Sequence, residues 1–333
     1  MDTNIPWVAA SVDELLAGAA DHEVVDPDDG KSGSRFAKVV IDGEPCFVKS
    51  VSYESDWIMR VMHDHDQRTF LIWKAGIMHQ APECIDHTVI GMTLDGEGDS
   101  AVLTMLMHDV ADHLVPEGHD VVPEAQHLGF IDALAQLSAR FWGWDDPIGL
   151  CTLEERICAF AADNIVDELA RVEPSPVLVV ADEGWQRLPE RAPALAALVA
   201  EHHRDPRVLA DALRSTPQTF LHGDWKMGNL GMHPDGRTIL LDWAYPGTGP
   251  ACWDLAWYLS LNAARLPISK EQTVEAFRDA LERHGVDTEG WWERQVDVSL
   301  LALAVMFGWE KAVGSDAELA WWEERAVVGA ERL

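Results

Sequence analysis

Residues 219–231 read "TFLHGDWKMGNLG" and place His222, Asp224 and Asn229 at fixed steps between an apolar pair and a glycine. Gly-Asp and Gly-Asn pairs are also ordinary turn chemistry, so this stretch alone fits a plain loop. About ten residues later the apolar run "RTILLDWA" ends in Asp242. Two carboxylates and an amide oxygen are hard ligands that suit Mg²⁺. A carboxylate that the metal does not use can accept a proton from a substrate hydroxyl, whereas His222 is expected to hold the loop by hydrogen bonds.

The pattern H-x-D-x-x-x-x-N followed by a strand-end Asp resembles the catalytic and metal loops of the protein-kinase-like fold. "HGDWKMGN" followed by "LLDWAYPGTGPACWDLAWYL" is similar to the aminoglycoside phosphotransferase and choline kinase superfamily, and less similar to protein kinases. Trp243 stands where protein kinases have Phe-Gly, and the sequence has no Ala-Pro-Glu segment.

The resemblance implies a role for each matching residue. Asp224 would orient or deprotonate the acceptor hydroxyl. Asn229 and Asp242 would hold Mg²⁺ against the phosphates of ATP, and His222 and Asp254 would support the loop. The alternative is a glycine-rich hairpin that carries unrelated acids.

The first third of the chain should supply a lysine for the phosphates. "CFVKS" places Lys49 near the end of a strand, where the family's phosphate-contacting lysine lies. The family pairs this lysine with a helix Glu, but the helical stretch "HDHDQRTFLIWKAG" contains none. We predict that Asp66 takes that place; its other interpretation is a solvated acid at a helix start.

"DDGKSGSRF" contains Gly-Lys-Ser, but it is no P-loop, because Val25 stands where the motif needs a glycine five residues before Gly30. We interpret the segment as the turn between the first two strands. Ser32, Gly33 and Ser34 would offer N–H and hydroxyl donors to the triphosphate there, although a plain turn fits equally well.

Two further regions are candidate ligand contacts. Backbone groups near Met105 to Met107, in the last strand before the helical part, would bind the edge of adenine. Trp309 and Glu310 would line an acceptor pocket, because an aromatic ring beside a carboxylate suits a cation. Core packing is the favoured role for Trp309. The histidines of His63-Asp64-His65 and His202-His203 have no matching ligand cluster, so we expect no metal there.

The elements that must position these residues change in character along the chain. "SRFAKVVIDGEPCFVKS" is a hairpin around Asp42-Gly43. A mostly helical stretch follows over 56–76, and further strands are predicted over 87–92, 101–107 and 239–241. After about residue 109 the apolar spacing predicts amphipathic helices. "SLLALAVMFGWEKAV" is apolar nearly all round and should be buried.

These elements predict an α+β, protein-kinase-like fold with two lobes. A small β-rich lobe over 1–108 would bind the nucleotide, and a larger, mainly helical lobe over 109–333 would carry catalysis and the substrate. A ligand cleft between two such lobes is the ordinary expectation.

Composition excludes several classes of protein. The 333 residues are 47% hydrophobic and 25% charged, which is a globular profile. A formal charge of −32 repels nucleic acid and anionic membranes and would attract a cationic acceptor, although only seven of the basic residues are Lys and the excess also suits a saline cytoplasm. Five cysteines without a CxxC pair, no basic leader and no apolar run of about 18 residues predict a cytoplasmic protein.

The sequence therefore predicts an ATP- and Mg²⁺-dependent phosphotransferase that moves the γ-phosphoryl group to a hydroxyl of an amino sugar, an aminoglycoside or an amino alcohol. One alternative is a catalytically silent nucleotide-binding or scaffold protein of the same fold. The other, less favoured, is a protein kinase.

Overall fold

The structure is a computed structural model that describes residues 5–25, 32–171 and 175–333. The chain divides into two compact units. The first unit comprises Met1–Glu117 and Gly228–Ala244, and the second comprises Gly118–Met227 and Tyr245–Leu333. The functional lobes predicted over 1–108 and 109–333 stay a prediction.

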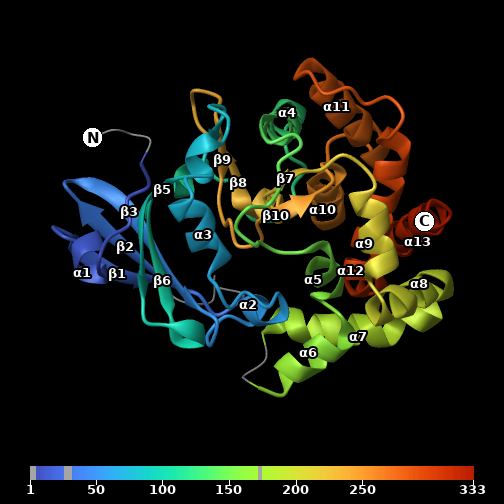
Figure 1. The fold of residues 1–333 in the computed structure, drawn as a ribbon, viewed down its shortest axis with the longest axis horizontal. Helices are drawn as coiled ribbons and strands as arrows, with labels where there is room; N and C mark the ends of the chain where they lie inside the picture. The colour runs from blue at the N-terminus through green and yellow to red at the C-terminus, as the bar shows by residue number, and fades with distance from the viewer. Residues whose placement is uncertain (1–4, 26–31, 172–174) are drawn as a thin grey trace. The chain divides into compact units, whose positions relative to one another are not determined.

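The first unit is built on a five-stranded antiparallel sheet in the order β1-β2-β3-β6-β5 (Figure 1). Its strands are β1 (Ala20–Val25), β2 (Arg35–Ile41), β3 (Glu44–Ser52), β5 (Val89–Asp95) and β6 (Val102–His108). Asp42 and Gly43 both have positive φ, 54° and 86°, which is the backbone of a two-residue hairpin turn. The predicted hairpin is confirmed; part of the turn between β1 and β2, residues 26–31, lies outside the described residues.

The stretch over 56–76 is mostly helical, as predicted, and forms two short helices, α2 (Trp57–Val61) and α3 (Arg68–Lys74). Asp56 caps α2 by accepting the N–H groups of Ile58 and Met59. The Asp64 carboxylate accepts the N–H of Arg68 and so starts α3 separately. Acidic side chains that accept N–H groups at each helix start thus separate the two helices.

A second, three-stranded sheet in the first unit carries two of the candidate ligands. Its order is β4 (Ile85–Asp86), β9 (Thr238–Leu240) and β8 (Leu230–Met232). β8 and β9 form an antiparallel hairpin that is extended by a bond from Leu241 N–H to Asn229 C=O. Asn229 and Asp242 therefore flank the same end of this hairpin. Further short elements among the described residues are α1 (Val12–Leu15), η2 (Met78–Gln80), η3 (Gly98–Ser100), η4 (Ala111–His113) and η5 (Met227–Asn229), which ends at Asn229.

The second unit is mainly helical, as the apolar spacing predicts. Its helices are α4 (Glu124–Arg140), α5 (Leu153–Cys158), α6 (Ala162–Leu169), α7 (Pro176–Arg191), α8 (Pro193–Arg204), α9 (Arg207–Arg214), α10 (Cys252–Asn262), η6 (Ala263–Arg265), α11 (Lys270–Arg283), α12 (Trp292–Val313) and α13 (Asp316–Ala330). Two short antiparallel strands, β7 (Thr219–Leu221) and β10 (Gly247–Gly249), join them.

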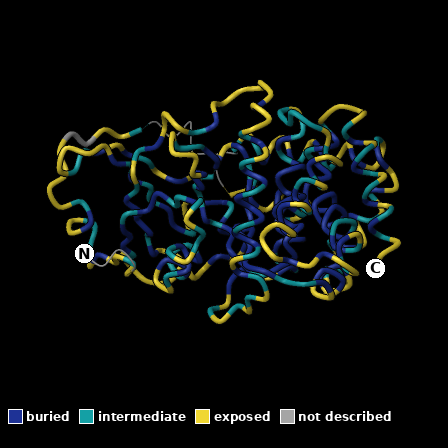
Figure 2. Tube along the Cα trace, turned by 90° about the horizontal axis from the view of Figure 1, so that it is seen from above, coloured by how far each residue is buried: buried dark blue, intermediate teal, exposed yellow. Residues whose placement is uncertain are grey.

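Helix α12 lies at the centre of the second unit and packs against α7, α8, α10 and α13 (Figure 1). Its residues 298–309 are all buried, which confirms the prediction made from its apolar sequence. Buried residues fill the inside of this bundle and exposed residues cover its outside (Figure 2). None of the described helices combines the length and the apolar character that a membrane crossing requires.

Candidate active site

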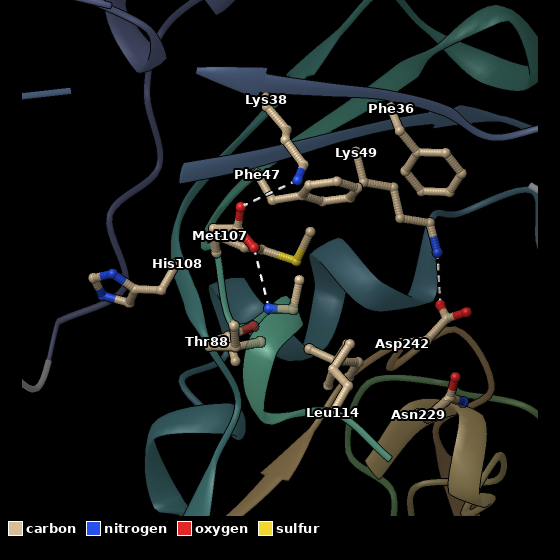
Figure 3. A pocket seen from close by; sticks show the side chains of 14 residues that line it. Phe36, Lys38, Phe47, Lys49, Thr88, Met107, His108, Leu114, Asn229 and Asp242 are labelled. Carbon is tan, nitrogen blue, oxygen red and sulfur yellow. Dashed lines mark hydrogen bonds and ion pairs between the residues drawn. The ribbon is translucent and has the colours of Figure 1, made fainter. Parts of the chain in front are cut away.

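A cavity of about 260 Å³ opens in the first unit (Figure 3). Its apolar walls come from the sheet and from the segment after β6. Its polar side chains are Lys38, Lys49, Thr88, His108, Asp109, Asn229 and Asp242. The lining residues include Phe36, Phe47, Lys49, Thr88, Met107, Leu114, Asn229, Leu241 and Asp242. Apolar walls with a few convergent polar groups are typical of a small-molecule site.

The structure brings together three residues that the sequence singles out, Lys49, Asn229 and Asp242 (Figure 3). The Lys49 ammonium donates to Asp242 Oδ1 over 2.7 Å. Asp242 has a left-handed backbone, with φ of 57°, which Asp tolerates better than most residues do. One end of the cavity therefore holds a cation, a carboxylate and an amide.

The other end of the cavity lies at Thr88, away from Asp242 (Figure 3). Thr88 is only 1% exposed, and its hydroxyl has no hydrogen-bond partner within the described residues. Its φ is 60°, an outlier for a β-branched side chain. The Thr88 C=O accepts the N–H of His108, and this bond ties the strained residue to the end of β6.

β6 is an inner strand, so Met105 and Met107 pair with β3 on one side and with β5 on the other. This pairing uses the backbone that the sequence analysis assigned to adenine. The segment that follows, beginning at Asp109, leaves the sheet and also lines the cavity. The backbone of the segment that begins at Asp109 is therefore a better candidate for contact with a base than the backbone at 105–107.

The predicted phosphate-covering turn has a different partner in this structure. Ser32 Oγ and Ser34 Oγ both donate to Asp56 Oδ2, over 2.5 Å and 3.3 Å. A Cβ on Gly33 would lie closer than 3.0 Å to the C=O of Ser55, so the turn is packed tightly on the start of α2. Because both hydroxyls donate to Asp56, only the backbone N–H groups of this turn would be donors to a phosphate.

Asp56, rather than Asp66, is the buried acid whose pKa the charge of Lys49 affects, and Lys49 itself forms an ion pair with Asp242. Asp66 is exposed, whereas Asp56 is 4% exposed, and neither side chain lines the cavity. Burial raises the pKa of Asp56, while the charge of Lys49 lowers it and that of Asp242 raises it, so Asp56 lies within electrostatic reach of both. An acid directly before the apolar run that starts at Trp57 is an N-cap signal, and this signal could have identified it.

In the second unit, the loop after β7 is fixed to α10. Asp254 lies in the first turn of α10 and accepts the N–H of His222 and the N–H of Gly223, each over 2.9 Å. His222 Nδ1 in turn accepts the N–H of Asp224 over 3.2 Å. Burial raises the pKa of Asp254 to about 6, against the opposing effect of the Arg156 charge and of these N–H groups. The supporting contacts predicted for His222 and Asp254 are present.

The sequence analysis missed two partners of the Asp224 carboxylate. The Trp257 indole donates to Oδ1 over 2.9 Å, and the Lys226 ammonium donates to Oδ2 over 2.7 Å. Lys226 is one of only seven lysines and lies two residues after Asp224. Trp257 lies three residues after Asp254 on one helix, a spacing that puts both on the same face.

Trp309 is 6% exposed and packs against Phe160 and Phe307 in the core of the second unit. Glu310 forms an ion pair with Lys311 over 2.6 Å. Core packing, the favoured role for Trp309, is what the structure shows, and the acceptor contact stays a prediction. Across the described residues, no group of three or more His, Cys, Asp or Glu side chains could hold a metal.

The sheet-rich first unit and the helical second unit are those of a kinase-like fold. Residues 71–292 match the sequence profile described as the phosphotransferase enzyme family. The match spans more than half of the chain, so the chain belongs to this family, and the resemblance noted in the sequence is confirmed. No curated protein matches the sequence.

Solved structures share the fold at low sequence identity. The choline kinase LicA from Streptococcus pneumoniae is 13% identical, with 96% of each chain covered and a TM-score of 0.54. A microcompartment-associated aminopropanol kinase is 12% identical, with 93% of this chain and 90% of that chain covered and a TM-score of 0.51. A structure of LicA in complex with AMP covers 95% and 93% of the two chains at 12% identity, with a TM-score of 0.54. These likenesses confirm the predicted fold class.

Proposed function

We propose that this protein is a small-molecule kinase that transfers the γ-phosphoryl group of ATP to a hydroxyl. The observation that carries the proposal is the convergence of Lys49, Asn229 and Asp242 on one cavity. The family match and the AMP bound to LicA support a nucleotide as the occupant of this cavity.

The two ends of the cavity suit the two ends of a nucleotide. Phe47 and Met107 offer apolar surface for a base between Lys49 and Thr88, whereas Phe36, the cross-strand partner of Lys49, lies at the Lys49 end (Figure 3). Lys49 supplies a point charge for phosphate oxygens at the other end. Thr88, whose hydroxyl is buried without a described partner, lies at the end where the base would bind.

Asn229 and Asp242 are the residues that would hold Mg²⁺. An amide and a carboxylate on one cavity fit this ion, which takes few protein oxygens and completes its shell with phosphate oxygens and water. The ion would neutralise charge on the phosphates during transfer. The sequence-based prediction of ATP and Mg²⁺ as cofactors is kept in this proposal.

Asp224 would align the acceptor and take its proton. The acceptor oxygen attacks the γ-phosphorus, the bond to the β–γ bridging oxygen breaks, and ADP leaves with the electrons of that bond. The hydroxyl proton passes to the Asp224 carboxylate. Catalysis then consists mainly of positioning and charge neutralisation.

We propose an amino alcohol or an amino sugar as the acceptor class. Two proteins of the same fold are a choline kinase and an aminopropanol kinase, and both names denote alcohols that carry a nitrogen. The formal charge of −32 would favour a cationic acceptor. The cytoplasmic location stays a prediction.

The test is ATP turnover with a panel of amino sugars and amino alcohols. The wild type should phosphorylate at least one of them, and Asp224→Asn should lower kcat by about 10²–10⁴-fold while Mg²⁺–ATP still binds. Asp242→Ala should weaken Mg²⁺–ATP binding. A wild type that binds Mg²⁺–ATP and phosphorylates nothing would favour the silent alternative, and an unaffected Asp242→Ala would refute the metal assignment.

A further inference from the structure

The carboxylate of Asp224 is held by two donors of different kinds. Trp257 donates its indole N–H to Oδ1, and Lys226 donates from its ammonium to Oδ2. Trp257 is 2% exposed, whereas the Lys226 side chain is 35% exposed. One donor is neutral and enclosed in the core, and the other is charged and reaches solvent.

Packing on two sides fixes the indole of Trp257. Its ring meets Phe307 edge to face, with centroids 4.9 Å apart, and lies 5.9 Å from the ring of Tyr245. An aromatic side chain has only two rotatable bonds, and both are constrained by such contacts. The indole N–H therefore has a fixed direction, which a solvated lysine lacks.

Helix α10 therefore holds both the backbone and a side chain of the loop. Asp254 holds the backbone N–H groups of residues 222 and 223, and Trp257, three residues later, holds the side chain of Asp224. A functional carboxylate needs this kind of support, because its direction decides which oxygen meets the substrate.

We propose that Trp257 is the positioning residue of Asp224, and that Lys226 is a displaceable counter-charge whose place at Oδ2 the acceptor hydroxyl takes. This inference rests on the proposed role of Asp224. The indole keeps Oδ1 engaged without adding charge, so Oδ2 is the oxygen presented to the acceptor. Lys226 balances the buried carboxylate until the acceptor arrives.

The same helix offers a matched control. Trp253 is fully buried on α10, but its indole N–H has no hydrogen-bond partner within the described residues. Trp257→Phe and Trp253→Phe both remove an indole and keep an aromatic ring. Only the first removes a donor to Asp224.

The first experiment needs no acceptor. In ¹⁵N-labelled protein, the indole resonances of Trp257 and Trp253 are assigned by their loss in the two Phe variants. Asp224→Asn should shift the Trp257 resonance upfield, because a neutral amide is a weaker acceptor than a carboxylate, and should leave the Trp253 resonance in place. A chemical shift of Trp257 that does not change in Asp224→Asn would overturn the proposal.

The second experiment separates positioning from packing by kinetics. With the acceptor found in the panel, Trp257→Phe should lower kcat about ten- to hundredfold and leave the Kd of Mg²⁺–ATP unchanged, whereas Trp253→Phe should keep both. Lys226→Met should change the acceptor KM more than Trp257→Phe does. Equal losses in the two Phe variants, or wild-type kcat in Trp257→Phe, would contradict the proposal. If no acceptor is turned over, the proposed function fails, and the resonance experiment decides this inference alone.

Discussion

Asp56 shows how one buried carboxylate can organise several segments. It accepts the N–H groups of Ile58 and Met59, and it also accepts the hydroxyls of Ser32 and Ser34. The turn over 32–34 and the start of α2 are thus held by a single side chain. The charge of Lys49 reaches the same carboxylate.

Removing this side chain should destabilise the first unit. Asp56→Ala leaves four donors without their acceptor, so the free energy of unfolding should fall by about 3 kcal/mol. Asp66→Ala changes an exposed acid and should stay within about 0.5 kcal/mol. Urea denaturation of both variants measures the difference, and equal effects would remove Asp56 from this supporting role.

At the residue scale, the sequence predicts candidate site residues where they lie close to one another along the chain. The spacing of His222, Asp224 and Asn229, with Asp242 a hairpin later, predicts a catalytic and metal-binding loop, and that role stays a prediction. The local signals at Asp56, an N-cap position, and at Trp257, a helical spacing from Asp254, do not reveal the partners of these residues. Their importance depends on contacts made by folding, with Ser32 more than twenty residues from Asp56 and Asp224 more than thirty from Trp257.

At the scale of elements, the loop after β7 fits against its neighbours only because residue 223 is glycine. Gly223 has a φ of 83°, and a Cβ there would lie closer than 3.0 Å to the C=O of Tyr245 and to the guanidinium of Arg156. The positive φ would strain the backbone of any other residue, and the short Cβ distances would produce a clash with buried atoms.

Two glycine substitutions separate these two effects. Gly223→Ala should lower the free energy of unfolding by about 3 kcal/mol or more, because it incurs both the strain and the clash. Gly285→Ala has a similar φ of 87° but meets nothing within 4 Å, so it should cost about 1 kcal/mol. Chemical denaturation of the two variants gives both values. Similar losses would show that backbone strain alone decides the effect.

The attachment of the loop to α10 should also depend on pH. Folding raises the pKa of Asp254 from 3.8 to about 6, so between these values the native protein holds a proton that the unfolded chain has released. The contribution of this group to stability is therefore fully present below pH about 4 and is lost as the pH rises through about 6.

Asp254→Asn removes this titration and keeps the shape of the side chain. From pH 4.5 to 6.5, the free energy of unfolding of the wild type should fall relative to that of the variant by about 2 kcal/mol. Urea denaturation across this pH range measures the difference in unfolding free energy between the two proteins. The contributions of the other titrating groups cancel in this difference. Parallel curves for the two proteins would show that Asp254 keeps an ordinary pKa in the folded state.

Elements were predictable where their signal is local. The hairpin at Asp42-Gly43 follows from two residues that accept positive φ, and α12 follows from its apolar sequence. In the mostly helical segment over 56–76, Asp56 caps α2, and the Asp64 carboxylate accepts the N–H of Arg68 at the start of α3. Whether an acid lies on a helix surface or accepts backbone N–H groups depends on its burial, and both of these acids are buried.

At the scale of the whole molecule, the charge is strongly unbalanced. The chain has 57 acidic and 25 basic residues, so at most 25 acids can each find a separate basic partner. Many of the ion pairs involve exposed side chains, such as Arg207 with Asp205 and Arg187 with Glu183. Exposed pairs contribute about 0–1 kcal/mol each, so they do not offset repulsion that acts across the surface.

Salt should therefore stabilise this protein. Raising KCl from 0.1 M to 1 M shortens the Debye length from about 10 Å to about 3 Å, which removes repulsion between distant acids and weakens only marginal pairs. Tm should rise by at least about 4 °C, equivalent to roughly 1–2 kcal/mol for a chain of this size. Calorimetry in KCl and in NaCl measures the shift, and agreement between the two salts excludes a specific cation site. A Tm that falls with salt would mean that the paired charges outweigh the acidic excess, and that the charge of −32 does not limit stability.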